Sequence, residues 1–280
     1  MKKLKYKGRA FKNKIITLVV LTLSVVGYLG YDKVTAYIKS NTTKAPKIEY
    51  TQAGSINKEP AVQGPTQTSS ENISQNVTFD SGVDLSGLDI HNIPADGKHY
   101  VELGASNFSE EELNQVSQDN PYQLQSVDVF GRAIQADAYL NRKNYKGSKD
   151  RPRITVNPVG WHNEQLGKKK SLYNRSHLLA YAFMKANIDV KENLVTGLEE
   201  FNKSKTQGMQ KFENEVELAV KRGKTIRYQV RAVYDDQELL PRGVLMRYKS
   251  LDDNSIDKTV FVYNVMDGVS VDYSTGYRIK

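Results

Sequence analysis

The chain has 280 residues, of which 39% are hydrophobic and 26% charged; this suffices for a globular core of one or two domains and excludes a polytopic membrane protein. The absence of Cys excludes disulfides, thiolate nucleophiles and zinc–thiolate sites, and the presence of only four His favours oxygen ligands for any bound metal. The net charge of +8 is not a property of the whole chain, because residues 1–14 hold seven basic residues and no acid, which leaves +1 for the remainder.

The N-terminal part predicts a segment that directs export. Residues 1–14 form a basic cytoplasmic n-region, and residues 15–31 are an apolar run without charge. As a helix this run would span about 25 Å, slightly less than a bilayer core of about 30 Å. Positive charge before the run keeps the N-terminus inside and exports the rest. We interpret residues 15–31 as a signal anchor, with a cleaved signal peptide as the alternative.

The next segment predicts a tether, followed by one folded domain. Residues 32–85 are rich in Thr, Ser, Gln, Asn, Lys and Pro and poor in large apolar side chains, so they are expected to be a disordered polar tether. We place the start of the folded domain at residue 86 and its end at residue 280.

The folded domain shows mixed α and β patterns in chain order. Residues 107–116 predict a helix with Ser109 as N-cap, and residues 200–222 predict a helix interrupted at Gly208, with an apolar stripe on one face. Strands are expected at residues 99–103 and 133–140, and an antiparallel meander at 225–234, 244–248 and 259–264. Residues 178–185 suit a short helix or an extended run, and residues 193–197 a turn or short strand. The fold class is therefore α+β.

Positive charge gathers in residues 142–175. This window holds ten cations against two acids and also contains Trp161, the only Trp. Such a composition suits a groove for a polyanion, in which basic side chains neutralise phosphates and Trp161 packs or stacks. The run Lys168, Lys169 and Lys170 taken alone would also suit an ordinary solvated loop.

The sequence Asn174-Arg175-Ser176-His177 runs directly into an apolar segment and is the strongest candidate for chemistry. One interpretation is a structural His at the end of a strand or helix. The other is a His that activates water beside a hard divalent metal, with Asn202 and Glu213 further along the chain. On one straight helix Asn202 and Glu213 would stand about 16 Å apart. They could serve one site only if the chain bends, and Gly208 is where a bend is expected.

Several short motifs together resemble the DNA/RNA non-specific endonucleases, most closely the membrane-anchored DNA-entry nucleases and secreted DNases of Gram-positive bacteria. The resemblance covers roughly residues 86–280. It rests on four stretches of this sequence: Pro158-x-Gly160-Trp161-His162, Asn174-Arg175-Ser176-His177-Leu178-Leu179-Ala180-Tyr181, Asn193-Leu194-Val195, and Asn202. The family motif is usually Asp-Arg-Gly-His, so here Asn174 and Ser176 replace its Asp and Gly.

The resemblance implies a ββα-metal nuclease fold, in which a central antiparallel sheet with flanking helices carries one strand–helix unit with the site. His177 would be the general base, Asn202 the single protein ligand of Mg²⁺ (with Mn²⁺ as the alternative ion), and Arg175 the arginine near the phosphate. Glu213 would hold a metal-bound water. The expected supporting residues are Asn174 and Asn193, and the expected substrate contacts are Trp161, His162, Lys168, Lys169 and Lys170.

These expectations describe a Mg²⁺-dependent endonuclease, indifferent to sequence and sugar, that hydrolyses extracellular DNA and RNA to products with 5′-phosphate ends. Its role would be DNA uptake or degradation of extracellular DNA. It would sit in the cell membrane by a single span, with uptake machinery as a partner, or be secreted after signal cleavage. Three alternatives stay open: a non-catalytic surface protein that binds DNA or acidic wall polymers, a degenerate family member, and His162 in place of His177 as the base.

Overall fold

The computed structural model describes residues 83, 85, 87–149, 151–168 and 170–280. The n-region, the signal segment and the tether predicted for residues 1–85 lie almost entirely outside this part of the chain. Among the residues that are described, no helix has the length and apolar character needed to cross a membrane.

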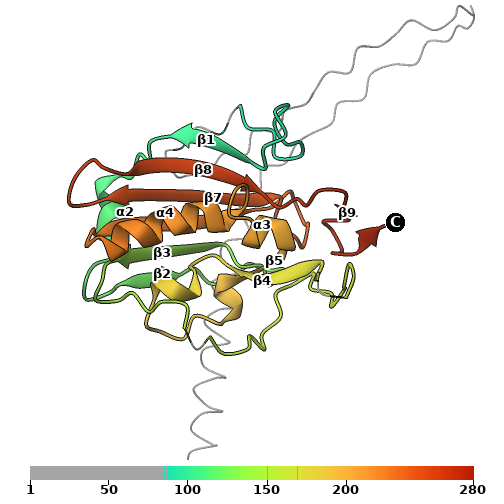
Figure 1. Cartoon of the computed structure of the whole chain (residues 1–280), viewed down its shortest axis with the longest axis horizontal. Helices are drawn as coiled ribbons and strands as arrows, with labels where there is room; N and C mark the ends of the chain where they lie inside the picture. The colour runs from blue at the N-terminus through green and yellow to red at the C-terminus, as the bar shows by residue number, and fades with distance from the viewer. Residues whose placement is uncertain (1–82, 84, 86, 150, 169) are drawn as a thin grey trace, which may run out of the picture. The chain divides into compact units, whose positions relative to one another are not determined.

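A six-stranded antiparallel sheet forms the centre of the described part (Figure 1), in the order β1-β8-β7-β6-β3-β2. The expected meander at the C-terminal end is confirmed, as are the strands expected near residues 99–103 and 133–140, whereas β2 was not predicted. The bounds are β1 Tyr100–Gly104, β2 Tyr122–Leu124, β3 Gln135–Leu140, β6 Ile226–Val233, β7 Gly243–Ser250 and β8 Asp257–Tyr263.

Among the described residues, three α-helices accompany the sheet: α2 (Glu110–Asn114), α3 (Glu199–Lys203) and α4 (Met209–Lys221). The predicted N-cap Ser109 is confirmed, since its hydroxyl accepts from the Glu112 N–H and Glu112 completes a capping box. The helix that it begins is shorter than predicted. The predicted interruption is also confirmed, because the chain leaves α3 at Ser204 and Gly208 is the N-cap of α4.

Gly208 is required where it stands. A Cβ at this position would collide with the carbonyl oxygens of Glu200 and Phe201, so the chain can pass this close to α3 only with glycine. Because of this turn, α3 and α4 do not form one straight helix. The separation expected for Asn202 and Glu213 on a single straight helix therefore does not apply.

A second, two-stranded sheet carries the sequence that the motifs singled out. Strand β4 (Tyr173–His177) pairs antiparallel with β5 (Leu194–Leu198), and β5 leads directly into α3. The connection between the two strands contains the 3₁₀ turns η1 (Tyr181–Phe183) and η2 (Lys191–Asn193), so the apolar run after His177 is neither a full helix nor a strand. Near the C-terminus β9 (Ser270–Val271) pairs with β10 (Arg278–Ile279).

The two faces of the central sheet differ in chemistry. Along β6, Tyr228 and Val230 belong to the main apolar core together with Phe212 and Val216 of α4. This confirms that the predicted apolar stripe of the helix is core, and Figure 1 shows α3 and α4 lying across the sheet. The alternate residue Arg227 points to the opposite face, where it donates to the carbonyl oxygen of Glu112 in α2.

Candidate active site

His177 lies at the end of β4, with its side chain only 5% exposed. Its Nε2 lies 2.6 Å from Oδ1 of Asp189, and its Nδ1 lies 2.9 Å from a guanidinium nitrogen of Arg151. A guanidinium can only donate hydrogen bonds, so Nδ1 must accept. The ring is therefore neutral, with its proton on Nε2 and a lone pair on Nδ1 that accepts from Arg151.

The surroundings of His177 hold it in this neutral form. Burial lowers the pKa of His177 to about 4, the charge of Arg151 lowers it further, and the hydrogen bond to Asp189 acts in the opposite direction. At neutral pH the imidazole is thus available to accept a proton at Nδ1.

The residues before His177 alternate between the two sides of β4. Arg175 turns to the same side as His177, where its guanidinium carbon lies 4.3 Å from the ring centre of Trp161 and its Nε donates to Asn157 Oδ1 at 2.9 Å. Ser176 is fully buried on the other side against Gly197, where an added Cβ would collide with the Ser176 hydroxyl. The Ser that replaces the usual motif glycine is therefore accommodated in the core, away from the side of His177.

Asn174, which replaces the usual motif aspartate, lines the same cavity as Arg175. Its side-chain nitrogen is buried and has no hydrogen-bond partner among the described residues. A buried donor without an acceptor is costly, and such atoms are concentrated at sites that bind something.

Asn202 and Glu213 come from the two sides of the helix break. Asn202, on α3, is partly exposed and lines the cavity. Glu213 lies in the first half of α4; burial raises its pKa to about 7, while the charge of Arg151 lowers it. Its charge also acts on the buried hydroxyl of Tyr228, which has no hydrogen-bond partner in the described part of the chain. Arg151 is therefore within electrostatic reach of both His177 and Glu213.

A cavity of about 310 Å³ opens beside this group, and its wall is basic. Four cations line it against a single acid, Glu164. His177 and Glu213 are not among the lining residues, and Arg151, which lines the cavity and contacts His177, connects the two regions. The lining cations are Arg151, Arg153, Arg175 and Lys203.

His162 also lines the cavity but has a different environment from His177. Its Nε2 lies 2.9 Å from the carbonyl oxygen of Thr275, and its ring stacks on Tyr277 with centroids 4.0 Å apart. The described surroundings of His162 include no carboxylate partner, and a ring held by stacking suits contact with substrate better than proton transfer.

The two described residues of the lysine run are not part of the cavity wall. Lys170 forms an ion pair with Glu200 at 3.1 Å, and neither Lys168 nor Lys170 is among the residues that line the cavity. Lys169 lies outside the described residues.

Asn193 is fully buried behind the site. It accepts from the Leu179 N–H and donates to the carbonyl oxygens of Leu179 and Ile188. These bonds join the chain after β4 to the loop before η2, and therefore support the position of His177 indirectly.

Two residues at this site were missed by the reasoning from sequence. Arg151 was only one of ten cations in the basic window, and nothing in the sequence distinguished it from its neighbours. Asp189 had no signal at all, because it is 12 positions from His177 in a loop whose path depends on tertiary packing.

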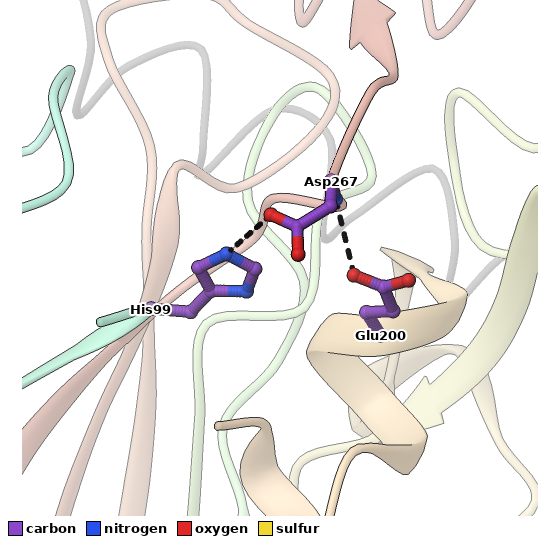
Figure 2. Close-up of side chains that lie close together, drawn as sticks. All are labelled: His99, Glu200 and Asp267. Carbon is purple, nitrogen blue, oxygen red and sulfur yellow. Dashed lines mark hydrogen bonds and ion pairs between the residues drawn. The ribbon is translucent and has the colours of Figure 1, made fainter. Parts of the chain in front are cut away.

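A separate group of side chains has the composition of a metal site. His99, Glu200 and Asp267 offer ligand atoms that all lie within 4.8 Å of one another (Figure 2). Figure 2 shows His99 directed at Asp267 and the backbone N–H of Asp267 directed at Glu200. The His99 Nε2–Asp267 Oδ1 distance is 3.1 Å, and the Asp267 N–H donates to Glu200 Oε2 at 3.0 Å. These polar groups thus already bond to one another within the protein. The cluster of His99, Glu200 and Asp267 was not predicted from the sequence.

Comparison with known proteins agrees with the geometry. The model of the family described as DNA/RNA non-specific endonuclease matches residues 112–252, which is half of the chain. Among solved structures, the chain is similar to NucA from Streptococcus agalactiae with no metal bound, at 25% identity and a TM-score of 0.50, covering 56% of this chain and 77% of NucA.

Two further structures are similar in fold. NucA from Streptococcus agalactiae with magnesium bound has 23% identity and a TM-score of 0.53, covering 64% of this chain and 91% of the other. Sda1 nuclease with a zinc ion has 21% identity and a TM-score of 0.54, covering 65% and 97%. The central antiparallel sheet with few helices is consistent with a ββα-metal nuclease. The expected resemblance is confirmed, and this chain belongs to the DNA/RNA non-specific endonuclease family.

Proposed function

We propose that this protein is a Mg²⁺-dependent endonuclease that hydrolyses extracellular DNA and RNA without regard to sequence or sugar. The observation that carries the proposal is the state of His177, which is buried and neutral and has a lone pair on Nδ1 beside a cation-lined cavity. A phosphodiester needs a base for the attacking water and positive charge for the phosphate, and this arrangement supplies both.

His177 acts as the general base. Nδ1 takes a proton from water as the water oxygen attacks phosphorus, and the bond from phosphorus to the 3′ oxygen breaks. The product strands then carry 5′ phosphates. Arg151 occupies Nδ1 when no substrate is present, so a phosphate oxygen in the cavity would compete for its guanidinium and free the lone pair.

The residues present fit a magnesium ion. Asn202 lines the cavity and its carboxamide can offer an oxygen ligand, and Glu213, with a pKa near 7, can become a carboxylate beside a cation. Mg²⁺ retains most of its water and requires few protein ligands, so Asn202 as the direct ligand and Glu213 through water would hold it. When bound, the ion supplies neutralisation of charge on the phosphate and the leaving oxygen.

The cavity supports binding through the nucleic-acid backbone. Arg175 presents a guanidinium stacked on Trp161, and His162 presents a ring stacked on Tyr277. Contacts of this kind reach phosphates, sugars and base faces, which all sequences share. We therefore expect neither sequence preference nor strict discrimination between DNA and RNA.

The site of action is proposed from the sequence. The basic n-region and the apolar residues 15–31 would export the nuclease domain and hold it at the membrane as a single span, or release it if the segment is cleaved. An anchored enzyme suits DNA uptake, and a released one suits degradation of extracellular DNA.

The decisive experiment incubates the full chain with closed-circular plasmid and Mg²⁺, beside His177→Ala and Asn202→Ala. We expect wild type to nick and degrade the plasmid and His177→Ala to lose about 10²- to 10⁴-fold in rate. His91→Ala is the control, because the His91 side chain is exposed and forms an ion pair with Asp235, outside the cavity lining. If His177→Ala cuts as fast as wild type, the base assignment fails and His162→Ala is tested next. If no form cuts but a gel shift persists in chelator, the protein is a binding protein.

A further inference from the structure

The structure assigns Asp189 as the positioning residue for the general base: its carboxylate holds the His177 ring with the proton on Nε2, so that the lone pair of Nδ1 is directed to the attacking water. This inference rests on the proposed function, because it deepens the account of the same site. Asp189 would touch neither substrate nor metal, and would act only through His177.

The contact itself is short and protected from water. Asp189 Oδ1 lies 2.6 Å from His177 Nε2, and the two side chains are 16% and 5% exposed. Two other His–Asp contacts exist in the described residues, His99–Asp267 at 3.1 Å and His91–Asp235 at 3.6 Å, and in each the Asp is far more exposed, at 77% and 39%. A charge-assisted hydrogen bond gains strength when water is excluded, so the His177 pair is the one suited to fix a ring.

The tautomer follows from the two partners. Arg151 donates to Nδ1 and cannot accept, while Asp189 as a carboxylate accepts and cannot donate. Both partners therefore select the form with the proton on Nε2. Arg151 is exposed and is expected to leave when a phosphate binds, and Asp189 would then be the partner that keeps Nδ1 unprotonated before the reaction.

The loop that carries Asp189 is tied to the strand that carries His177. Asn193 accepts from the Leu179 N–H and donates to the Leu179 and Ile188 carbonyl oxygens, and Ile188 directly precedes Asp189. The Leu178 N–H also donates to the Asn193 carbonyl. The buried amide of Asn193 thus sets the position of Asp189 relative to His177.

The chemistry of proton transfer gives Asp189 a second effect. When Nδ1 takes the proton of the attacking water, the ring becomes an imidazolium with one N–H still directed at the Asp189 carboxylate. The Asp189 carboxylate stabilises this charge, as the carboxylate partner of a catalytic histidine does in other hydrolases. The charged groups that act on the ring are Asp189 and Arg151, and Glu213 acts on Arg151 from α4.

The test compares Asp189→Ala and Asp189→Asn with wild type and His177→Ala. We expect Asp189→Ala to lower kcat by about 10- to 1,000-fold and to leave KM within about twofold, because the ring loses its orientation but the cavity is unchanged. Asp189→Asn should retain more activity, since its amide oxygen still accepts from Nε2–H while the charge is lost. Asp235→Asn is the matched control, because it removes the carboxylate of a His–Asp pair outside the site.

A spectroscopic measurement separates positioning from folding. ¹⁵N NMR of His177 is recorded in an Arg151→Ala background, where Asp189 is the remaining ring partner; it should show the proton on Nε2 with Asp189 present, and a mixture of tautomers with a lower pKa of His177 in Asp189→Ala. If Asp189→Ala fails to fold, Asp189→Asn carries the test through kcat and the pKa of His177, both of which should fall when the carboxylate charge is lost. Full kcat in the variants, or an unchanged tautomer in Asp189→Ala, overturns the inference while inactive His177→Ala still supports the nuclease. If wild type does not cut nucleic acid, the proposed function fails, and the NMR result still decides whether Asp189 sets the tautomer.

Discussion

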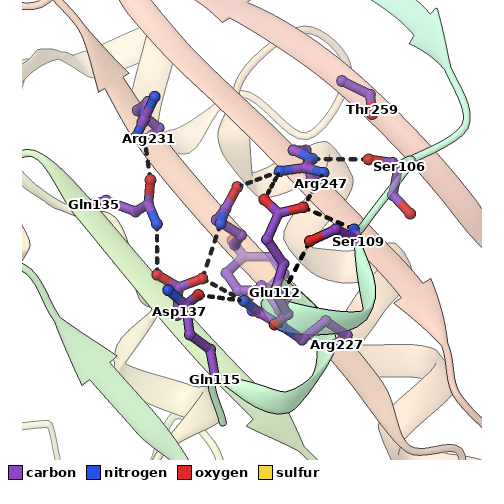
Figure 3. Close-up of polar contacts among 12 residues, drawn as sticks. Ser106, Ser109, Glu112, Gln115, Gln135, Asp137, Arg227, Arg231, Arg247 and Thr259 are labelled. Carbon is purple, nitrogen blue, oxygen red and sulfur yellow. Dashed lines mark hydrogen bonds and ion pairs between the residues drawn. The ribbon is translucent and has the colours of Figure 1, made fainter. Parts of the chain in front are cut away.

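The two faces of the central sheet differ in the state of their buried ionisable side chains. On one face these side chains are charged and paired, and on the other their pKa values are shifted toward the neutral form. On the face toward α2, Arg227 lies 2.5 Å from Asp137 and Arg247 lies 2.6 Å from Glu112, and both arginine side chains are fully buried. Figure 3 shows how the side chains of Gln135 and Ser109 and the backbone carbonyl oxygen of Ser106 complete this network. Burial would raise the pKa of Glu112, but hydrogen bonds from Arg247 and Ser109 lower it overall.

The face toward α4, continuing to β4, contains ionisable groups whose pKa values burial shifts toward the neutral form. Burial lowers the pKa of His177 to about 4 and raises that of Glu213 to about 7. The hydroxyl of Tyr228 on this face has no partner among the described residues. Paired charge stabilises the fold on one face, whereas the other face carries groups whose pKa values are shifted by burial, and such groups are concentrated at functional sites.

The largest effect on stability is expected from the paired face. Arg227→Met leaves the Asp137 carboxylate buried without its charged partner, and should lower the free energy of unfolding by about 3–5 kcal/mol. Denaturant titration measures this loss, and the rate of cleavage per folded molecule should stay unchanged. The double variant Arg227→Met with Asp137→Leu should recover much of the loss. A midpoint of unfolding equal to wild type would show that the network does not stabilise the fold.

On the face toward α4, removing an ionisable group should raise the free energy of unfolding instead of lowering it. Glu213 has a folded pKa of about 7 against an ordinary value of 4.5, so the folded state loses stability as pH rises from about 4.5 through 7. Glu213→Gln removes this loss and should raise the free energy of unfolding at pH 8 by up to about 3 kcal/mol, with little change at pH 4.

Denaturant titrations of both proteins across this pH range are the measurement, and Glu111→Gln, an exposed glutamate on α2, is the control. His177 has the reverse dependence, because its folded pKa of about 4 lies below the ordinary 6.5 and stability is lost as pH falls from 6.5 toward 4. A difference between Glu213→Gln and wild type that does not vary with pH would contradict the burial of the ionisable carboxyl.

The smallest effect is expected at the exposed pair on the surface. Lys170→Ala removes an ion pair with Glu200 whose side chains are 48% and 28% exposed, so stability should change by less than about 1 kcal/mol. KM for plasmid should also change little, because Lys170 does not line the cavity. Arg153→Ala, which removes a lining cation, should raise KM and is the comparison. An equal rise in KM for Lys170→Ala would restore the lysine run as a substrate contact.

Local patterns predicted the elements that depend on neighbouring residues. The cap at Ser109, the break at Gly208, the apolar stripe of α4 and the C-terminal meander all follow from spacing within one segment, and the structure has each of them. The short strand β2 and the 3₁₀ turn after His177 were missed, because three-residue elements carry too little periodicity to detect.

The sequence by itself determined the family, through the motif around His177, and the residue types of the chemistry. Only the tertiary structure decided which residues meet. Asp189 contacts His177 from a loop that Asn193 holds by a hydrogen bond to the Ile188 carbonyl oxygen. Arg151 contacts the same ring from a segment 26 positions earlier in the chain. Contacts of this kind depend on how β4, β5 and α4 pack together. The sequence pattern gives the spacing of residues along one segment, but it does not give the path of a loop in the folded protein.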